Sequence, residues 1–398
     1  MSSKKPKLAL SSVRVYNFKA IRNSKTVKFT PLTVFIGDNG SGKSSLFEAL
    51  ETMQIISEQG LDAAMNRWRG FEFIWNQTAK ANAKTKIVAS NVEMPRELYQ
   101  NAIRLEIHGY LAQQLYQADT EISLELKNST TNVLISQENI VRNRLKVVRN
   151  CFGQVSVDAE PIPRLAQEFK AEDGESAISR GLGGFLSAWQ FVLLSPETMG
   201  IPTPQKRTSG AIKLARDGSN IADYLRDILS IDTTAFEGII EAFKEVVPFA
   251  RDLQTQVAQE LQRTVYLEMT EGKFKIPGWM LSTGTIRVLA IIALLRHPTP
   301  PPIIFIEELE NGLDPRTLNL VVEEIRRAVE LQRTQVVITT HSPYLLDLLS
   351  LSQIVVVERV DGEPVFTRPA DHQSLKAWLE KFSPGQLYTM GRLRGAKS

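Results

Sequence analysis

Cysteine and histidine are scarce in this chain of 398 residues. Cys151 is the single cysteine, so no disulfide can form within the chain. The sequence has four histidines and no CxxC motif, and no two histidines stand at the spacing of metal ligands. A structural zinc site is therefore excluded, and a papain-like cysteine enzyme is disfavoured.

Long apolar runs and an excess of one charge are also missing. The longest uninterrupted apolar stretch is Val288–Leu295, whereas a helix that crosses a bilayer needs about twenty residues. The basic N-terminal segment lacks the apolar core and the cleavage site of a secretory signal. With 47 basic and 44 acidic residues, the net charge of +3 neither indicates nor excludes nucleic-acid binding. We expect a soluble, cytoplasmic protein that does not enter a membrane.

The pattern of apolar residues predicts an α/β protein. The β-branched run Leu32–Ile36 predicts a buried strand that ends in a glycine-rich loop, with a helix starting near Lys43. Alternation from about 102 to 157 predicts an antiparallel lobe, and helical spacing from 220 to 261 predicts helices with a break at Pro248. In the last third, strands alternate with helices, as in a largely parallel sheet covered on both faces. The further strands expected are Trp189–Leu194, Ile303–Ile306, Gln335–Thr339 and Ile354–Val357, and the buried helix is Ser282–Leu295.

The strongest motif is the segment Gly37–Ser44, which reads GDNGSGKS and fits the phosphate-loop pattern GxxxxGK[ST]. Glycines let successive backbone N–H groups turn toward one anion, and the helix that follows adds its positive end. In this pattern Lys43 reaches the β- and γ-phosphates of a nucleotide, and the Ser44 hydroxyl binds Mg²⁺. The residues expected to hold the nucleotide are Gly37, Asn39, Gly40, Gly42, Lys43, Ser44 and Ser45.

A second motif is the apolar run Ile303–Ile306, which two acids follow, Glu307 and Glu308. Such a run is typical of a buried strand that presents carboxylates at its C-terminal end, where open α/β sheets bind ligands. One carboxylate can hold Mg²⁺ through water, and the next can orient and deprotonate an attacking water. We assign Glu307 to the metal and Glu308 to the catalytic base.

Further segments complete an ordered set: DGSN at Asp217–Asn220, LSTGTIR at Leu281–Arg287, NGLD at Asn311–Asp314 and TTHSP at Thr339–Pro343. With this order the chain resembles ATPases of the ABC class in their non-transporter branch, which includes RecF, Rad50 and the SMC proteins. It is most similar to the stand-alone bacterial AAA_21/AAA_15 ATPases, which are related to the ATPase half of OLD nucleases. The last three segments resemble the signature, the D-loop and the switch-histidine motif of that class.

The resemblance implies ATP as the ligand and gives several residues a role. Two ATPase heads of this class dimerise head to tail with two ATP molecules between them. Ser282 and Gly284, at a helix start, would then face the γ-phosphate held by the other subunit. His341 would contact the γ-phosphate and sense its loss, and Asp314 would belong to the nucleotide site. Gln190 is the nearest candidate for the glutamine that contacts Mg²⁺ in this class.

The long stretch between Lys43 and Leu281 shows no sustained heptad pattern, so coiled-coil arms like those of cohesins are excluded. The stretch after His341 is short for a Toprim nuclease domain, so we expect no nuclease in this chain. A linker is expected around Pro161 and Pro163. We expect an ABC-type ATPase head with a mixed or parallel sheet, an antiparallel β lobe and a helical lobe. The expected division is 1–101 for the N-terminal core half, 102–210 for the β-rich lobe, 211–280 for the helical lobe and 281–398 for the C-terminal core half.

The expected function is that of an ATP-dependent dimeric switch that controls a separate effector protein, such as a nuclease, in anti-phage defence or DNA maintenance. ATP would close a homodimer, or a higher oligomer, and DNA or another nucleic acid would be a further partner. The alternative is a RecF-like repair ATPase that binds DNA directly, which salt-dependent DNA affinity without a partner would favour. A transporter motor is disfavoured because the signature is not LSGGQ. A scaffold with dead sites is disfavoured because Lys43, Ser44, Glu308 and His341 are intact.

We expect the substitution Lys43→Ala to abolish ATP binding, because the loop then loses the cation that reaches the β- and γ-phosphates. Titration calorimetry with ATP and Mg²⁺ measures this affinity directly. Unchanged ATP affinity in the Lys43→Ala protein would contradict the assignment of Gly37–Ser44 as a phosphate loop.

Overall fold

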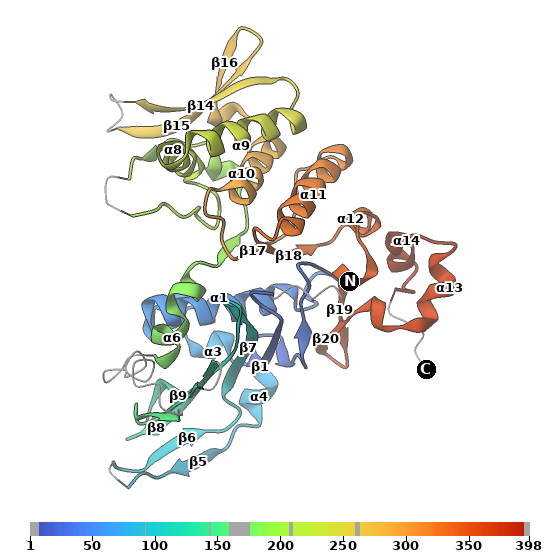
Figure 1. Cartoon of the computed structure of the whole chain (residues 1–398). Helices are drawn as coiled ribbons and strands as arrows, with labels where there is room; N and C mark the ends of the chain where they lie inside the picture. Colours follow the sequence, from blue (N-terminus) through green and yellow to red (C-terminus); the bar gives the residue numbers. More distant parts are fainter. Residues whose placement is uncertain are drawn as a thin grey trace. The chain divides into compact units, whose positions relative to one another are not determined.

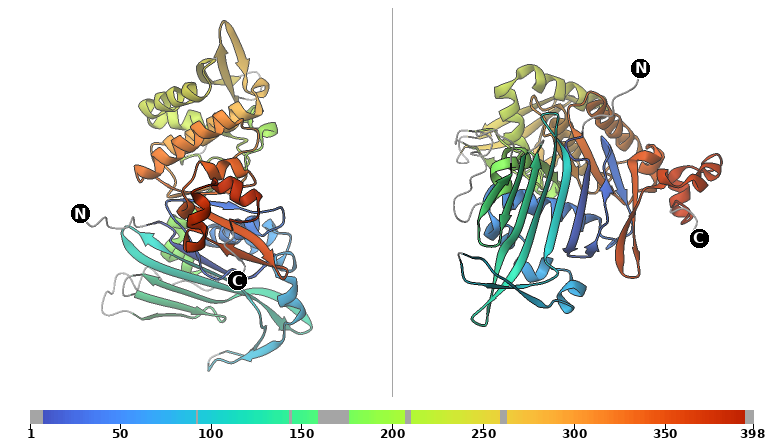
Figure 2. Two further views of the ribbon diagram at one scale, coloured as in Figure 1. Left: turned by 90° about the vertical axis from the view of Figure 1, so that its right-hand side faces the viewer. Right: turned by 60° about the horizontal axis from the view of Figure 1, so that its bottom comes forward.

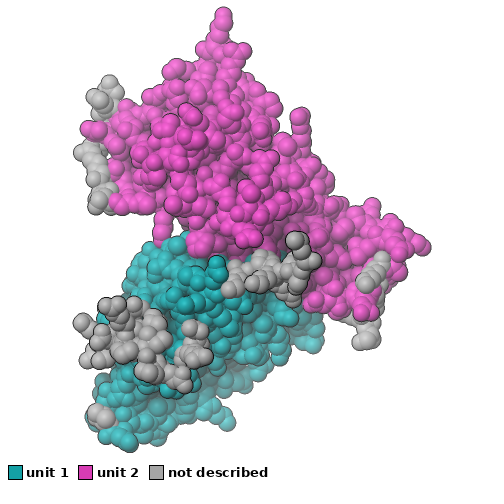
Figure 3. Space-filling view, viewed as in Figure 1, with its two compact units in different colours: residues 1–30, 37–189, 355–367 teal, residues 31–36, 190–354, 368–398 magenta. Residues whose placement is uncertain are grey.

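The computed structural model is drawn in Figure 1 and from two further sides in Figure 2. It describes residues 8–91, 93–142, 145–158, 176–206, 210–258 and 263–393. The chain forms two compact units, which are coloured separately in Figure 3. Unit 1 holds residues 1–30, 37–189 and 355–367, and unit 2 holds residues 31–36, 190–354 and 368–398. The linker expected around Pro161 and Pro163 lies outside the described residues.

Unit 1 is built on an antiparallel sheet of ten strands, which confirms the expected antiparallel lobe. The strands lie in the order β11-β10-β9-β8-β7-β1-β2, with β3 beside β1 and with β6 between β5 and β8. Figure 2 shows the long strands side by side in its right-hand view. Val13 of β1 pairs with Ile107 of β7, so the N-terminal strand belongs to the same sheet as the lobe. The strands are Ser12–Phe18 (β1), Ile21–Asn23 (β2), Val27–Lys28 (β3), Thr85–Val88 (β5), Arg96–Tyr99 (β6), Ile103–Leu111 (β7), Gln114–Lys127 (β8), Thr130–Arg142 (β9), Leu145–Asn150 (β10) and Val155–Asp158 (β11).

Two helices pack on the apolar face of this sheet, α1 (Lys43–Gln59) and α6 (Ala177–Ser187). The side-chain amide of Gln54 on α1 donates to the carbonyl oxygens of Leu186 and Trp189, at 2.8 Å each. The helix that follows the phosphate loop is thereby fixed to the end of α6. Unit 1 also contains the short helices α2 (Leu61–Arg67), α3 (Phe71–Ile74) and α4 (Gln77–Ala81). Its last part is the hairpin of β19 (Ile354–Val360) and β20 (Glu363–Thr367), of which residues 355–367 belong to unit 1.

Unit 2 contains parallel strands in the order β12-β17-β18-β4. Every residue of these strands is buried, as expected for a parallel sheet covered on both faces. Each of them lies where the apolar runs of the sequence predict it. The strands are Leu32–Ile36 (β4), Gln190–Val192 (β12), Ile303–Ile306 (β17) and Gln335–Thr340 (β18).

The chain leaves these strands at one edge of the sheet because they run in the same direction. Thr340 is the register partner of Ile36, and Ile306 is the partner of Ile338. The segments that follow β4, β17 and β18 are the phosphate loop, the acidic pair and the switch-histidine motif, respectively. Within unit 2 the acidic pair and the switch-histidine motif therefore leave the sheet at the same edge.

The helical part of unit 2 is shorter than the sequence pattern predicts. α8 (Ile221–Ile231) and α9 (Thr233–Val246) confirm the first half of the predicted helical region, and α9 ends just before Pro248. The prediction of helix is wrong over residues 250–258, because β14 (Ala250–Ala258) is a strand, and residues 259–261 lie outside the described residues. It pairs with β15 (Thr264–Glu271), whose Val265, Leu267 and Met269 alternate into the core. A short window of sequence does not reveal pairing with a later strand. The helical spacing of the apolar residues therefore led to a wrong prediction for this segment.

The buried helix α10 (Thr283–Arg296) and the amphipathic α11 (Pro315–Glu330) lie as predicted. No helix among the residues that the structure describes is both long and apolar enough to cross a membrane. The other elements of unit 2 are β13 (Thr203–Pro204), β16 (Phe274–Pro277), α7 (Pro196–Met199), α12 (Pro343–Asp347), α13 (Lys376–Leu379), α14 (Pro384–Thr389) and the 3₁₀ turns η1 (Gly278–Met280), η2 (Leu351–Gln353), η3 (Pro369–Asp371) and η4 (Gln373–Leu375). The four-part domain division expected above stays a prediction.

Candidate functional site

The phosphate loop lies between β4 and α1. Gly42 stands at the N-cap of α1 with a φ of +109°, and no side-chain hydrogen bond caps that helix. The N–H groups of its first turn are therefore suited to an anion. The Lys43 ammonium donates to the carbonyl oxygens of Gly37 and Asp38, at 2.7 and 3.1 Å. The side chains of Asn39 and Ser44 are exposed, as a ligand would require.

The β19–β20 hairpin packs against this loop within unit 1. A β-carbon on Gly37 would lie 2.1 Å from the Val357 carbonyl oxygen, and one on Gly42 would lie 2.7 Å from the Pro364 ring. Arg359 Nε donates to the Gly40 carbonyl oxygen at 3.0 Å. The glycines of the motif therefore also make room for the hairpin. Arg359 is a contact of the phosphate loop that the sequence motifs did not predict, because only the fold brings residues so distant in sequence together.

Glu307, the predicted metal ligand, follows β17 and is largely buried. Its Oε1 atom lies 2.6 Å from Arg216 Nη2, in an ion pair within unit 2. Asp217 and Asn220 of the DGSN segment accept backbone N–H groups and hold the turn that carries Arg216. A carboxylate suits Mg²⁺ chemically, but a cation bound at this oxygen must first displace the Arg216 guanidinium.

Glu308, the predicted base, has a φ of +51°, which is unusual for any residue other than glycine. Such backbone costs about 1–3 kcal/mol and persists only where neighbours hold it. Its N–H donates to Thr339 Oγ1 at 3.1 Å, and its carbonyl oxygen accepts from Arg287 Nη2 at 2.9 Å. The Asn311 side-chain amide donates to its carboxylate. The Glu308 carbonyl oxygen also accepts the Asn311 N–H at 3.1 Å, and the Leu309 N–H donates to the Thr339 carbonyl oxygen at 3.3 Å. β18, α10 and the turn through Asn311 therefore hold Glu308 together.

The switch-histidine segment is tied to the same loop through Glu310. The Glu310 Oε1 atom accepts the backbone N–H of His341 at 2.6 Å. A carboxylate that accepts the first N–H after β18 fixes the loop that presents the His341 ring. His341 was predicted from its motif, whereas Glu310 was not. The available signal for Glu310 was its place two residues after Glu308.

The signature segment begins α10, as predicted. The Ser282 hydroxyl caps the helix by accepting the Thr285 N–H at 3.2 Å. Gly284 lies against the NGLD segment, because a β-carbon there would stand 2.6 Å from the carbonyl oxygen of Gly312. The signature and the loop after β17 therefore pack together within unit 2.

Arg287, the last residue of the signature motif, is only 3% exposed. It donates to the carbonyl oxygens of Leu194 at 2.6 Å and of Glu308 at 2.9 Å. Burial lowers the pKa of its guanidinium, and the carboxylates of Glu308 and Glu310 act in the opposite direction. A charged group at such a depth is retained only when it is well hydrogen-bonded.

The structure places two predicted site residues in local roles. Asp314 caps α11 by accepting the N–H groups of Arg316 and Thr317, and hydrogen bonds from Thr317 hold the pKa of its carboxyl below the usual value. Gln190 begins β12 and pairs in register with Ile304, so it lies within the strands and not at the end that carries the acidic pair. Its amide donates to the Leu214 carbonyl oxygen at 2.8 Å, and its role at a metal stays a prediction.

Within unit 2 the contacts join three motifs that are distant in sequence. Arg287 and Gly284 connect the signature to the loop after β17, and Glu310 connects that loop to His341. The residues Gly37, Asn39, Gly40, Gly42, Lys43, Ser44 and Ser45 belong to unit 1, and they form one continuous loop at the start of α1.

Comparisons with known proteins agree with this fold and with these motifs. Over 90% of this chain and 97% of the other, the structure is similar to a solved SMC head bound to the C-terminal winged-helix domain of ScpA, with a TM-score of 0.54 and 15% identity. At that identity the likeness shows the fold alone. The phosphate-loop motif and this fold define the class as a P-loop protein with an SMC-head-like fold.

Two family models specify the class further. Residues 9–150 match AAA_15, described as "AAA ATPase domain", and residues 206–347 match AAA_21, described as "AAA domain, putative AbiEii toxin, Type IV TA system". These two segments match the AAA_15 and AAA_21 ATPase domain models, which confirms the resemblance inferred from the motifs.

Curated relatives show a more distant similarity. ABC transporter G family member 41 of Arabidopsis thaliana is 28% identical over 192 residues, and ABC transporter G family member 52 of Oryza sativa subsp. japonica is 26% identical over 190 residues. Each match covers 46% of this chain and 13% of the relative. The similarity is therefore confined to a small part of those large proteins.

We expect Gly284→Ala to lower the free energy of unfolding by about 1–3 kcal/mol, because the added methyl group meets the Gly312 carbonyl oxygen. The matched control is Gly238→Ala on α9, where a β-carbon meets no atom within 4 Å. A helical alanine should stabilise that position by up to about 1 kcal/mol. Thermal unfolding of the three proteins measures both effects, and equal shifts of the two variants would contradict the close approach at Gly284.

Proposed function

We propose that this chain is an ATP-binding and ATP-hydrolysing switch that works as a dimer and controls a separate effector protein. The observation that carries the proposal is the fixed conformation of Glu308 at the carboxyl end of a buried parallel strand. A carboxylate held in one position is suited to orient and deprotonate a single water molecule. The matched ATPase domains and the phosphate-loop motif support ATP as the nucleotide that this water attacks.

The proposed reaction transfers the γ-phosphoryl group of ATP to water. Glu308 takes a proton from the water, and the water oxygen forms a bond to the γ-phosphorus. The bond from that phosphorus to the bridging oxygen of the β-phosphate breaks, and ADP leaves with the electron pair. Lys43 and the backbone N–H groups of Gly37–Ser44 stabilise charge on the phosphates. Mg²⁺, held by Ser44 and Glu307, would neutralise further charge there.

The dimer would use α10 of each copy. We propose that Ser282 and Gly284 offer the helix N-terminus to the γ-phosphate of ATP held by the second copy. His341 is proposed to contact the γ-phosphate held by its own chain. Glu310 connects the His341 backbone to the loop that carries Glu308. Loss of the phosphate at His341 would therefore change the position of that loop.

The effector proposed is a protein with its own catalytic activity, such as a nuclease, and the place of action is the cytoplasm. The family description that matches residues 206–347 names a toxin of a toxin–antitoxin system, which favours a role in bacterial defence. DNA or another nucleic acid is proposed as a further partner. Direct binding of DNA without an effector, as in RecF-like repair, is the alternative.

Glu308→Gln should leave ATP binding intact and lower the rate of hydrolysis about 10²- to 10⁴-fold, because the amide cannot accept the proton. ATP should then hold the dimer together. Phosphate release measures the rate, and light scattering coupled to gel filtration measures the mass. The control is Glu237→Gln, an exposed glutamate on α9, which should hydrolyse ATP at the native rate. Native turnover in Glu308→Gln would refute the assignment of the base.

The partner can be identified with the same variant, purified from its native host with ATP present. Mass spectrometry and sequencing then reveal bound protein and nucleic acid. A stoichiometric second protein that is lost with Lys43→Ala would support the switch and reveal its effector. Nucleic acid alone would favour the RecF-like alternative.

A further inference from the structure

Strand β14 lies at the edge of the small antiparallel sheet of unit 2. It pairs with β15 on one side, and no other strand that the structure describes pairs with it. At the start of the strand, the Asp252 carboxylate accepts the N–H of Leu253 at 2.9 Å. From Gln254 to Ala258, alternate backbone N–H and carbonyl groups face the open side, where a further strand can pair with them.

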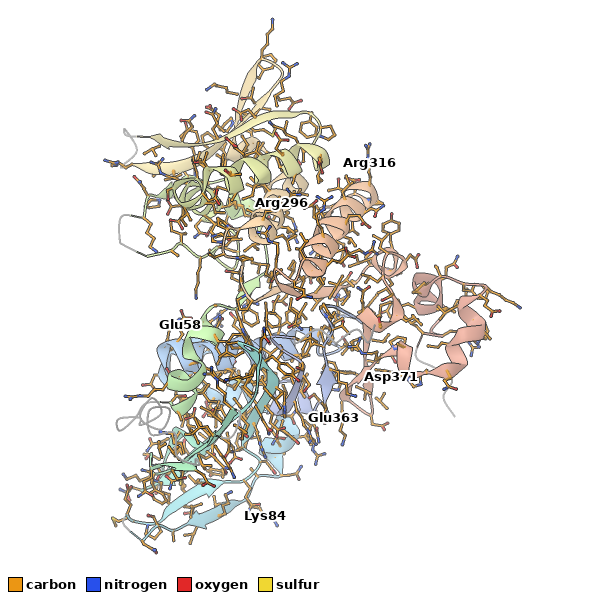
Figure 4. All side chains as sticks on the ribbon, viewed as in Figure 1. Glu58, Lys84, Arg296, Arg316, Glu363 and Asp371 are labelled. Carbon is orange, nitrogen blue, oxygen red and sulfur yellow. The ribbon has the colours of Figure 1, made fainter. Side chains whose placement is uncertain are left out.

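This edge lacks the features by which proteins protect a free strand from pairing with another chain. The other edge strands in the described ranges are at most five residues long. β5 also contains Lys86 and follows Lys84, which Figure 4 labels, and β20 contains Pro364. β14 has nine residues, and its last part, LQTQVA, includes no charged residue, proline or glycine. We therefore expect this strand to have a partner.

The free edge is complementary to a second copy of itself. An antiparallel pair centred on Thr255 would place Leu253 opposite Val257 of the second copy. These three residues are register partners of the buried residues of β15, so their side chains would extend the core face from one copy to the other. On the outer face, Gln254 would lie opposite Gln256 of the second copy. No two charged residues of β14 would be opposed in this register.

We propose that β14 joins two copies of this chain edge to edge, in a contact that needs no nucleotide. A two-fold axis perpendicular to the sheet makes the two β14 strands antiparallel and extends the two small sheets into one continuous sheet. The contact uses none of the residues assigned to ATP, so it goes beyond the proposed function. A single pair of strands is a small interface, and the dimer should therefore be weak and reversible.

The same contact would enlarge the assembly that ATP forms. This consequence rests on the proposed function, in which two copies close on two ATP molecules. A chain with two different two-fold contacts joins more than two copies, because it binds one neighbour at each contact. At high protein concentration with ATP, the Glu308→Gln protein should therefore exceed the mass of a dimer. Adding Gln254→Lys and Gln256→Lys to it should limit the mass to that of a dimer.

The edge contact is tested by sedimentation velocity of the full chain without nucleotide, over a series of protein concentrations. The wild type and Lys43→Ala should show the same equilibrium between monomer and dimer. Gln254→Lys/Gln256→Lys places lysine opposite lysine in the proposed register, so its dissociation constant should rise about tenfold or more. The matched control is Gln254→Lys/Gln256→Glu, which places lysine opposite glutamate and should dimerise at least as tightly as the wild type.

Both double variants should fold as the wild type does. Gln254 is exposed, and its register partner on β15 is Glu268, whose carboxylate attracts an added lysine within the same sheet. Circular dichroism checks that each variant is folded. Hydrogen exchange gives an independent measurement, because backbone amides in residues 254–258 should exchange more slowly as the wild-type concentration rises. The exchange in Gln254→Lys/Gln256→Lys should not depend on concentration in this way.

The outcomes are distinct. A weakened dimer in Gln254→Lys/Gln256→Lys, with Gln254→Lys/Gln256→Glu still dimeric, supports the contact. A wild type that stays monomeric at every concentration overturns it, as does equal behaviour of the two double variants. Slow exchange of residues 254–258 only when a different protein is bound also overturns it, in favour of a strand from that protein. The proposed function fails separately, if the wild type does not hydrolyse ATP, and the contact measured without nucleotide does not depend on that result.

Discussion

The left-handed backbone at Glu308 is the constraint on which the rest of unit 2 depends. An extended or helical conformation there would turn the acidic side chain and the loop after it in another direction. Three neighbours keep the residue in place: Thr339 of β18, Arg287 of α10, and Asn311 of the loop that carries Glu308 itself. Hydrogen bonds that involve a charged group are worth about 1.5–3 kcal/mol each, which is enough to offset a backbone cost of about 1–3 kcal/mol. The conformation of this segment is therefore set by hydrogen bonds to its neighbours and not by the intrinsic backbone preference of glutamate.

The burial of Arg287 follows from the same constraint. A guanidinium this deep in a helix lobe would be costly if its N–H groups had no acceptors. The strand ends nearby provide acceptors for the two terminal nitrogens, because the segments after β12 and β17 have left the sheet ladder and present carbonyl oxygens. Among the described residues the buried Nε atom has no hydrogen-bond partner. Arginine is suited to this place since its planar fork can serve two acceptors at once, which lysine cannot do with the same geometry.

The sequence predicted the parallel strands, the helix after the phosphate loop and the helix start at Ser282, because each depends on a local pattern. It misjudged residues 250–258, where pairing with β15 outweighs a helical period. It missed Arg216, Glu310 and Arg359, whose partners lie 91, 31 and 319 residues away along the chain. A residue whose role depends on a partner so distant in sequence has no local sequence pattern. A phosphate-binding loop has one, because its glycines, lysine and serine are close together in the sequence.

The hairpin behind the phosphate loop has a consequence for how the chain acquires its structure. Gly37 and Gly42 contact Val357 and Pro364, so the loop and a segment near the end of the chain share one steric surface. During synthesis the N-terminal sheet and α1 emerge long before that hairpin exists. The loop can therefore reach its final packing only after residue 364 has been added. Contacts of such long sequence separation also slow folding.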